Sequence, residues 1–215
     1  MKRILIGMLL LLGTAHAQDT VSIHHTRFTT TFDKNLHYPV LVHWIVTSND
    51  VCKPHTPRRV ERSDSYFRSD PLLADYTRLR NIYENNAGGY QRGHNMDAAD
   101  NSCNLQQMKE CHYFSNITPQ TLELNEHTWG DLEDHTRHMV ELYGTVEVWC
   151  GSFGHKDTMG PVAVPDSCWK IIRYNHTIEA YMFPNTHDVD HNHYDFYQAR
   201  VSDIRTATHL KLNGI

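Results

Sequence analysis

The sequence has no long hydrophobic run beyond its first seventeen residues, which excludes a bilayer-spanning helix from the rest of the chain. It also has no excess of positive charge, since 20 lysines and arginines stand against 25 aspartates and glutamates, for a formal net charge of −5. A protein that holds nucleic acid across a broad basic surface is therefore disfavoured, whereas one that grips a few phosphates with placed arginines is not. Internal repeats and low-complexity tracts are absent. The 215 residues fit one domain better than two.

Cysteine is scarce, and its spacing matches no zinc-binding pattern. In an oxidising compartment five cysteines would tend to pair and leave one over. A bridge between Cys150 and Cys168 would join two strand-like runs, and one between Cys103 and Cys111 would close a short loop. Cys52 would then be the odd thiol, although the sequence does not fix the connectivity.

The amino-terminal segment has the layout of a secretory signal peptide. Lys2 and Arg3 precede an apolar run at residues 4–12, and Ala15 and Ala17 place small residues two apart. We therefore expect residues 1–17 to be removed and residues 18–215 to form a single domain that works outside the cytoplasm, secreted or periplasmic.

Alternating strand-like and helix-like runs predict an α+β fold with a mixed antiparallel sheet and flanking helices. We expect strands at residues 38–47, 90–96, 146–152, 168–174 and 177–183. We expect helices at residues 74–83, 104–111, 124–143 and 204–210, the last capped by Ser202 or Asp203. Residues 19–33 show no clear period, residues 49–62 read as a loop, and Thr118 and Pro119 as a turn.

The long helix expected at residues 124–143 carries polar residues beside its core stripe. That stripe comprises Trp129, Leu132, Met139, Val140 and Tyr143. Asn125 falls within the stripe, where an amide must find partners, and Glu133 and Arg137 lie at its margin. Taken alone, the helix favours an ordinary interpretation, in which Asn125 is a cap and Glu133 and Arg137 form an i,i+4 ion pair worth a few tenths of a kcal/mol.

Further motifs in the same order along the chain reverse that interpretation. They are Gln91-Arg92-Gly93-His94, residues 113–120 (YFSNITPQ), Leu124-Asn125, and Trp129 through Leu132-Glu133. Together they resemble the DNA/RNA non-specific endonuclease family, the ββα-metal (His-Me finger) nucleases. The family signature reads D-R-G-H, Y-L-S-N-I-T-P-Q, L-N and W-x-x-L-E, and the intervals from Asn116 to Asn125, Glu133 and Arg137 are also those of the family.

The resemblance implies a hydrolytic site with one metal ion. His94 would be the general base that takes a proton from the attacking water. Asn125 would be the only direct protein ligand of a Mg²⁺ ion, with Mn²⁺ as the alternative. Glu133 would orient water around the cation, and Asn116 would orient groups near His94.

Arginines would hold the phosphate as negative charge builds on it. The resemblance assigns this role to Arg92 and Arg137. The family has a further arginine upstream, for which Arg62 is our candidate, with Arg59 or Arg68 as alternatives because the spacing there is not matched cleanly.

One position departs from the family pattern. Gln91 stands where the family has aspartate, so a charge is lost and two hydrogen-bond donors are gained. Cation affinity, rate or pH optimum could shift as a result. We nevertheless expect an enzyme, a metal-dependent endonuclease acting on DNA and RNA with little sequence specificity. A phosphodiesterase for small nucleotides and a catalytically weak secreted binding module are the alternatives.

A histidine-rich loop at residues 185–194 is the remaining cluster of potential ligands. His187, His191 and His193 could bind a transition metal. A solvated loop is the favoured interpretation.

Overall fold

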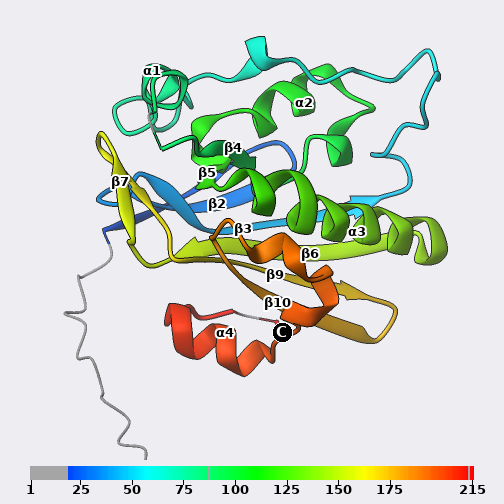
Figure 1. Ribbon diagram of the computed structural model, residues 1–215. Coiled ribbons are helices and arrows are strands. Elements are labelled where there is room, and N and C mark those ends of the chain that lie inside the picture. The colour runs from blue at the N-terminus through cyan, green and yellow to red at the C-terminus, as the bar shows by residue number, and fades with distance from the viewer. Residues whose placement is uncertain (1–18, 87, 213) are drawn as a thin grey trace, which may run out of the picture.

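The computed structural model describes residues 19–86, 88–212 and 214–215 (Figure 1). The expected signal peptide, residues 1–17, lies outside the described residues. Among the helices that are described, none is both long and apolar enough to cross a membrane.

A six-stranded antiparallel sheet forms the centre of the molecule, in the order β1-β2-β3-β6-β9-β10. Its strands are β1 (Thr20–His24), β2 (Phe28–Asp33), β3 (Tyr38–Thr47), β6 (Thr145–Phe153), β9 (Ser167–Tyr174) and β10 (Thr177–Pro184). Two small antiparallel pairs stand beside it. They are β4 (Gln91–His94) with β5 (Ile117–Gln120), and β7 (Asp157–Met159) with β8 (Val162–Val164).

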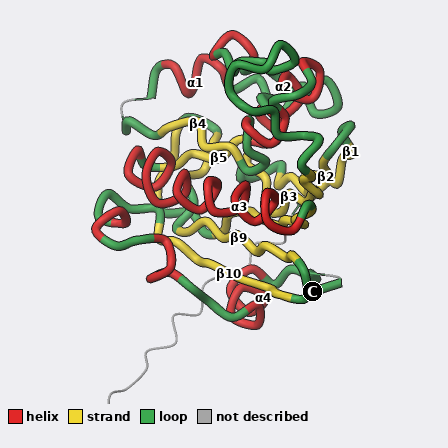
Figure 2. The backbone as a smooth tube through the Cα atoms, turned by 90° about the vertical axis from the view of Figure 1, so that its right-hand side faces the viewer, coloured by secondary structure: helices red, strands yellow, loops and turns green. Residues whose placement is uncertain are grey.

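Helices cover both faces of the sheet. They are α1 (Arg80–Glu84), α2 (Leu105–Cys111), α3 (Trp129–Tyr143) and α4 (Val201–Thr208). In Figures 1 and 2 the strands β9 and β10 lie between α3 and α4, so these two helices pack on opposite faces. Single turns of 3₁₀-helix span Asp64–Tyr66, Ala99–Asn101, Phe114–Asn116, Val189–His191 and Tyr194–Tyr197, and a π-helical segment, Glu123–Thr128, leads directly into α3.

The alternation of side chains between the two faces of each strand explains why helices cover both faces of the sheet. On β6, Val148 and Cys150 face α3, whereas Trp149 between them joins the cluster on the other face with Ile204 of α4. Successive strand side chains point to opposite faces. Strands that are apolar on both sides therefore need a cover on each, and α3 and α4 supply those covers.

The α+β class with an antiparallel sheet and helices is confirmed, but several elements differ from the sequence expectation. Residues 19–33 form β1 and β2, whose threonine-rich strands lack a hydrophobic period because they lie at one edge of the sheet. Thr118 and Pro119 lie inside β5 and do not form a turn. Only Arg80–Glu84 is α-helical in the region expected to be helical at 74–83. The pair β7–β8 was not predicted.

Two predictions about helix ends were also wrong. Tyr143 was expected in the core stripe of the long helix, but its side chain is 47% exposed and stacks on Tyr174. The reason is that Tyr143 ends α3, one residue before the left-handed Gly144. The N-cap of α4 is Arg200, not Ser202 or Asp203. Asp203 instead accepts a hydrogen bond from the backbone N–H of Arg200, as the partner residue of a capping box does.

The cysteine pairing predicted from sequence is also wrong. Cys52 and Cys103 form a disulfide, and Cys111, Cys150 and Cys168 are free and buried. The strand register explains why Cys150 and Cys168 do not pair, since Cys168 lies opposite Ser152 and not opposite Cys150.

Candidate active site

The β4–β5 pair holds the histidine of the first motif at its end. His94 is the last residue of β4 and lies opposite Ile117, while Gly93 lies opposite Thr118. A side chain at position 93 would overlap the buried side chain of Gln120, which reaches across from β5. The glycine is therefore needed for close cross-strand packing, a reason that its place in the motif does not reveal.

The His94 ring is buried among aromatic side chains. It is 6% exposed, with its centroid 5.3 Å from that of Phe67 and 4.7 Å from that of His112. Burial lowers the pKa of His94 well below its ordinary value, and the nearby His112, Arg62 and Arg92 lower it further. The imidazole is therefore neutral near pH 7, the form that can accept a proton.

Asn125 reaches the same region from the π-helical segment before α3. The wider π turn shifts the positions of Glu123–Thr128 relative to a continuous α-helix. As a result Asn125 is half-buried at the wall of a cavity of about 260 Å³ and does not lie within the core stripe. Because helical structure already begins at Glu123, Asn125 is not a cap. The cavity is lined by Arg62, His94, Asp97, Asn125, Glu126, Gly130 and Glu133.

Glu133 lies one turn into α3, above a buried lysine. Its carboxyl group is 15% exposed and 3.8 Å from the Lys170 ammonium group, which packs over the Trp129 ring at 4.0 Å. Burial raises the pKa of Glu133 to about 7, although the charge of Lys170 opposes that change. Glu133 therefore titrates near neutral pH, and its cationic neighbour is Lys170 rather than Arg137.

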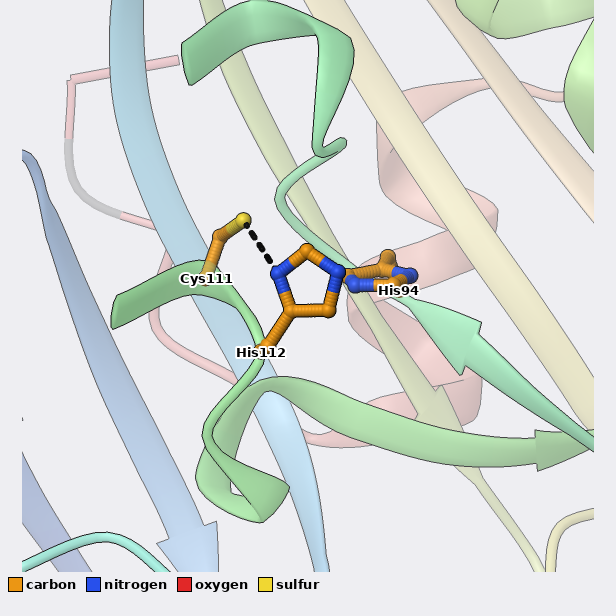
Figure 3. Close-up of side chains that lie close together, drawn as sticks. All are labelled: His94, Cys111 and His112. Carbon is orange, nitrogen blue, oxygen red and sulfur yellow. Dashed lines mark hydrogen bonds between the residues drawn. The ribbon is translucent and has the colours of Figure 1, made fainter. Parts of the chain in front are cut away.

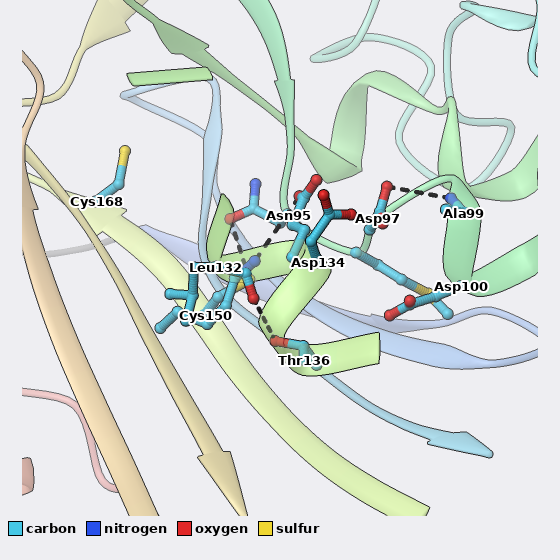
Figure 4. A network of polar contacts seen from close by, with 12 residues as sticks. Asn95, Asp97, Ala99, Asp100, Leu132, Asp134, Thr136, Cys150 and Cys168 are labelled. Atoms are coloured by element: carbon cyan, nitrogen blue, oxygen red, sulfur yellow. Dashed lines mark hydrogen bonds and ion pairs between the residues drawn. The ribbon is translucent and has the colours of Figure 1, made fainter. Parts of the chain in front are cut away.

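Arg137 is engaged by carboxylates and does not line the cavity. Its guanidinium group forms ion pairs with Asp97 and Asp134, whose side chains lie together in Figure 4. Burial lowers the pKa of Arg137 to about 10, and the charge of Arg59 contributes. The ordinary i,i+4 pair of Glu133 with Arg137 does not form, and the phosphate-binding role expected for Arg137 stays a prediction that requires these pairs to open.

Two other arginines are better placed. A second cavity of about 270 Å³ adjoins the first and is lined by Arg62, Asp64, Phe67, Gln91, Arg92, Asn125 and Glu126. Arg92 packs over the Phe67 ring at 4.3 Å and lies 3.4 Å from the Asp64 carboxylate. Arg62 is exposed and lines both cavities.

The alternatives to Arg62 are occupied elsewhere. Arg59 forms an ion pair with Glu61, and Arg68 packs on the Tyr113 ring. Arg62 is therefore the upstream arginine that the fold brings to the site.

Asn116 lies behind the site and not in it. It is fully buried, donates hydrogen bonds to the carbonyl groups of Met96 and Cys111, and accepts one from the N–H of Met96. The side chain thus fixes the segment that follows His94. Its predicted role in orienting groups around His94 is compatible with this bracing, which acts through backbone contacts.

Sequence reasoning missed Asp97, Lys170 and Phe67. Asp97 lies three residues after His94 and could have been suspected from that proximity. Lys170 and Phe67 come from distant segments and carried no local signal. The histidine-rich loop gives separate pairs and no cluster, since His187 contacts Glu123 and His193 contacts Asp195.

The oxygen atoms in the first cavity suit a hard divalent cation. The Asn125 amide and the Glu133 carboxylate face the same space, and Asp97 adds a further carboxylate at its wall. Few protein ligands and room for water are what Mg²⁺ requires, because it gives up its hydration shell reluctantly. The residues present therefore fit such an ion.

Comparison with known proteins places this arrangement in a family. The model of the DNA/RNA non-specific endonuclease family matches residues 11–213. A nuclease from a Nostoc species is 37% identical over 117 residues, which cover 52% of this chain and 41% of that protein. Human mitochondrial endonuclease G is 32% identical over 91 residues, covering 42% of this chain and 30% of that protein. The chain spans less than half the length of these two relatives.

A solved structure shows the same fold. The crystal structure of the EndoG/EndoGI complex, which concerns EndoG inhibition, matches with a TM-score of 0.78 at 24% identity, over 89% of this chain and 84% of that chain. The family match extends over nearly the whole sequence and the fold agrees with it. The chain therefore belongs to the DNA/RNA non-specific endonuclease family and is a nuclease-family enzyme.

Proposed function

We propose that the protein hydrolyses phosphodiester bonds of DNA and RNA with little sequence specificity, using a divalent cation, Mg²⁺ or Mn²⁺, outside the cytoplasm. The observation that carries the proposal is the shared cavity of His94 and Asn125. A buried neutral base and a set of hard oxygen atoms, brought together from segments some thirty residues apart, are the two parts that water-mediated phosphodiester cleavage needs.

His94 is the general base in this proposal. Its ring borders the cavity, so a water molecule there can approach the imidazole and give it a proton. Phe67 and His112 pack against the ring and fix its orientation. The lowered pKa keeps the base unprotonated at neutral pH.

Asn125 would hold the cation, and Glu133 would accept hydrogen bonds from water around it. The bound cation supplies Lewis-acid stabilisation of the charge that develops on the phosphate and on the leaving 3′ oxygen. Arg62 and Arg92 bind phosphate oxygens in the adjoining cavity. The products would carry a 5′-phosphate.

The test compares the purified parent with His94→Ala on plasmid DNA and on RNA, each with Mg²⁺ and with EDTA. We expect cleavage only with Mg²⁺, and a loss of roughly 10²–10⁴-fold in the variant. His138→Ala is the matched control, because His138 is an exposed histidine at the far end of α3. A His94→Ala protein as active as the parent would rule out the general base.

Two alternatives have distinct outcomes in the same assay. If polymers survive with Mg²⁺ while a small phosphodiester is cleaved, the protein is a phosphodiesterase for small nucleotides. If neither substrate is cut, a binding module is favoured.

A further inference from the structure

One position of the central sheet carries a charge where the alternation of the strand predicts an apolar residue. On β9, the side chains of Cys168, Ile172 and Tyr174 belong to the core beneath α3. Lys170 falls between them in the same alternation, and its side chain is only 1% exposed. Lysine is almost never fully buried unless it is paired. The burial of this ammonium group therefore needs a reason other than packing.

Two side chains of α3 contact the buried ammonium group. The Nζ atom of Lys170 lies 4.0 Å from the centroid of the Trp129 ring and 3.8 Å from a carboxylate oxygen of Glu133. Trp129 and Glu133 stand four residues apart, so both project from the same side of the helix. The aromatic face replaces part of the hydration that the ammonium group has lost, and the carboxylate balances its charge.

Other titratable groups around Lys170 balance its charge less directly. Cys150 lies opposite it on β6, and Cys168 lies two residues before it, but burial raises the pKa of both thiols and keeps them neutral. Asp100 is a buried carboxyl group whose pKa is raised by burial to about 6. Among the described residues, Glu133 is the one carboxylate within ion-pair distance of Lys170.

We propose that Lys170 is a positioning residue for phosphodiester cleavage, whose ammonium group holds the Glu133 carboxylate ionised at the wall of the cavity. At 3.8 Å the two groups attract each other by charge but are too far apart to share a hydrogen bond. The oxygen atoms of Glu133 therefore stay available to water around a cation. The effect on cleavage rests on the proposed function, whereas the charge pair itself does not.

The direction of the effect follows from the charges around Glu133. Burial raises the pKa of Glu133 to about 7, and the charge of Lys170 is the largest influence that opposes the rise. Asp100 raises this pKa further, and Arg62 at the cavity wall lowers it. Removing the charge of Lys170 therefore leaves burial and Asp100 largely unopposed, and Glu133 loses its proton only at a higher pH.

Three further titratable side chains line the cavity, namely His94, Asp97 and Glu126. Asp97 is paired with an arginine of α3, and Glu126 is exposed. The His94 ring packs against His112, and Figure 3 shows the His112 ring between the His94 ring and the Cys111 sulfur. Burial, His112 and two arginines lower the pKa of His94. We therefore expect a change at Lys170 to leave the protonation of His94 as it is.

An NMR titration of the Glu133 carboxyl carbon tests the charge pair without reference to activity. The signal is assigned by its loss in Glu133→Gln, and EDTA keeps divalent cations out. We expect a midpoint near pH 7 in the parent. In Lys170→Met the midpoint should lie about one to three pH units higher. Equal midpoints in the two proteins overturn the proposal.

A second lysine of the chain supplies the matched control. Lys109 also lies over an aromatic ring, with its Nζ atom 5.7 Å from the centroid of Tyr66. Lys109→Met should leave the midpoint of Glu133 at the parent value. An equal shift in Lys109→Met and Lys170→Met would mean that loss of any lysine moves the titration, which overturns the proposal.

Folding measurements separate positioning from a purely structural role. Methionine is close to lysine in length and suits a core position, so we expect Lys170→Met to fold. At pH 5, where Glu133 is protonated, its midpoint of urea unfolding should equal or exceed that of the parent. Lys170→Gln removes the same charge and serves as a second variant. If neither variant folds, Lys170 serves the fold and the proposal is overturned.

Cleavage assays test the effect on the reaction. At pH 6.5 and subsaturating Mg²⁺, we expect Lys170→Met to lower kcat/KM at least about tenfold, and the loss to shrink as pH rises. In a Glu133→Gln background the same change should alter kcat/KM less than about twofold, because the group on which Lys170 acts is gone.

Two other outcomes of these assays are decisive. A loss that is equal at every pH and in both backgrounds would show that Lys170 acts through the fold and not through Glu133, which overturns the positioning role. If the parent cleaves no substrate, the proposed function fails, while the NMR titration still decides whether Lys170 and Glu133 form the charge pair.

Discussion

Burial shifts the pKa values of His94 and Glu133, which both line the cavity, in opposite directions. It lowers the pKa of His94, and it raises the pKa of Glu133 to about 7. Both changes favour the neutral form, because a charge inside the protein loses its hydration. A divalent cation near Asn125 would favour ionised Glu133, so the cavity holds its negative charge best when the cation is present.

Glu133 makes stability depend on pH in a defined direction. The folded pKa is raised above the unfolded value of 4.5 to about 7, so the folded state binds more protons between these values. Stability is therefore highest below pH 4.5, falls as pH rises to 7, and is constant beyond. In EDTA we expect the free energy of unfolding of the parent, relative to Glu133→Gln, to fall by about 3 kcal/mol across that window.

Urea unfolding of both proteins at several pH values between 4.5 and 8 provides the measurement. Taking the difference between the proteins cancels the titration of histidines common to both. Parallel pH profiles for parent and variant would contradict the prediction. Adding Mg²⁺ should flatten the difference, because the ion stabilises the carboxylate.

A disulfide closes the segment that carries several of the candidate site residues. The Cys52–Cys103 disulfide closes a segment of sequence separation 51 that contains Arg62, Arg92 and His94. Most of residues 49–62 form no helix or strand, so the disulfide ties a long irregular segment to the end of the turn at Ala99–Asn101.

Removing this disulfide should destabilise the fold substantially. Loop-closure entropy for this separation predicts that Cys52→Ser combined with Cys103→Ser lowers the free energy of unfolding by about 4 kcal/mol. Urea denaturation of the double variant, compared with the oxidised parent in which the disulfide is intact, gives the value. A loss below about 1 kcal/mol would show that other contacts already constrain residues 52–103.

The net charge of the molecule affects how it would bind a polyanion such as nucleic acid. At −5, the protein relies on local arginines and not on its overall field. Arg62 and Arg92 border the cavity that adjoins the proposed metal site, whereas Arg137 is held by Asp97 and Asp134. We therefore expect the proposed binding of nucleic acid to neutralise few phosphates.

The salt dependence of cleavage measures the number of phosphates that the protein neutralises. We expect a plot of log kcat/KM against log salt concentration to have a slope of about −2, and Arg62→Ala to reduce its magnitude by about one. Arg137→Ala is the comparison, and its slope should equal that of the parent if the ion pairs of Arg137 with Asp97 and Asp134 stay closed. A slope steeper than about −5 would indicate an extensive basic surface.

Much of the fold could be predicted because the signals were local. The strands β3, β6, β9 and β10 follow apolar, β-branched runs, and α2 and α3 follow helical periods. The edge strands β1 and β2 escaped prediction because threonine-rich strands acquire their pattern only when a neighbour pairs with them. The disulfide partner of Cys52 was equally hidden, because contact between residues 52 and 103 is decided by the path of the chain between them.

The sequence by itself determined which chemical groups are available. His94, Asn125 and Glu133 stand in motifs whose order and intervals indicate the family, because those intervals are set by one hairpin and one helix. Only the tertiary structure decided what surrounds these groups. It buries His94 against Phe67 and His112, places Lys170 beneath Glu133, and commits Arg137 to Asp97, because burial and charge pairing depend on side chains brought together from distant segments.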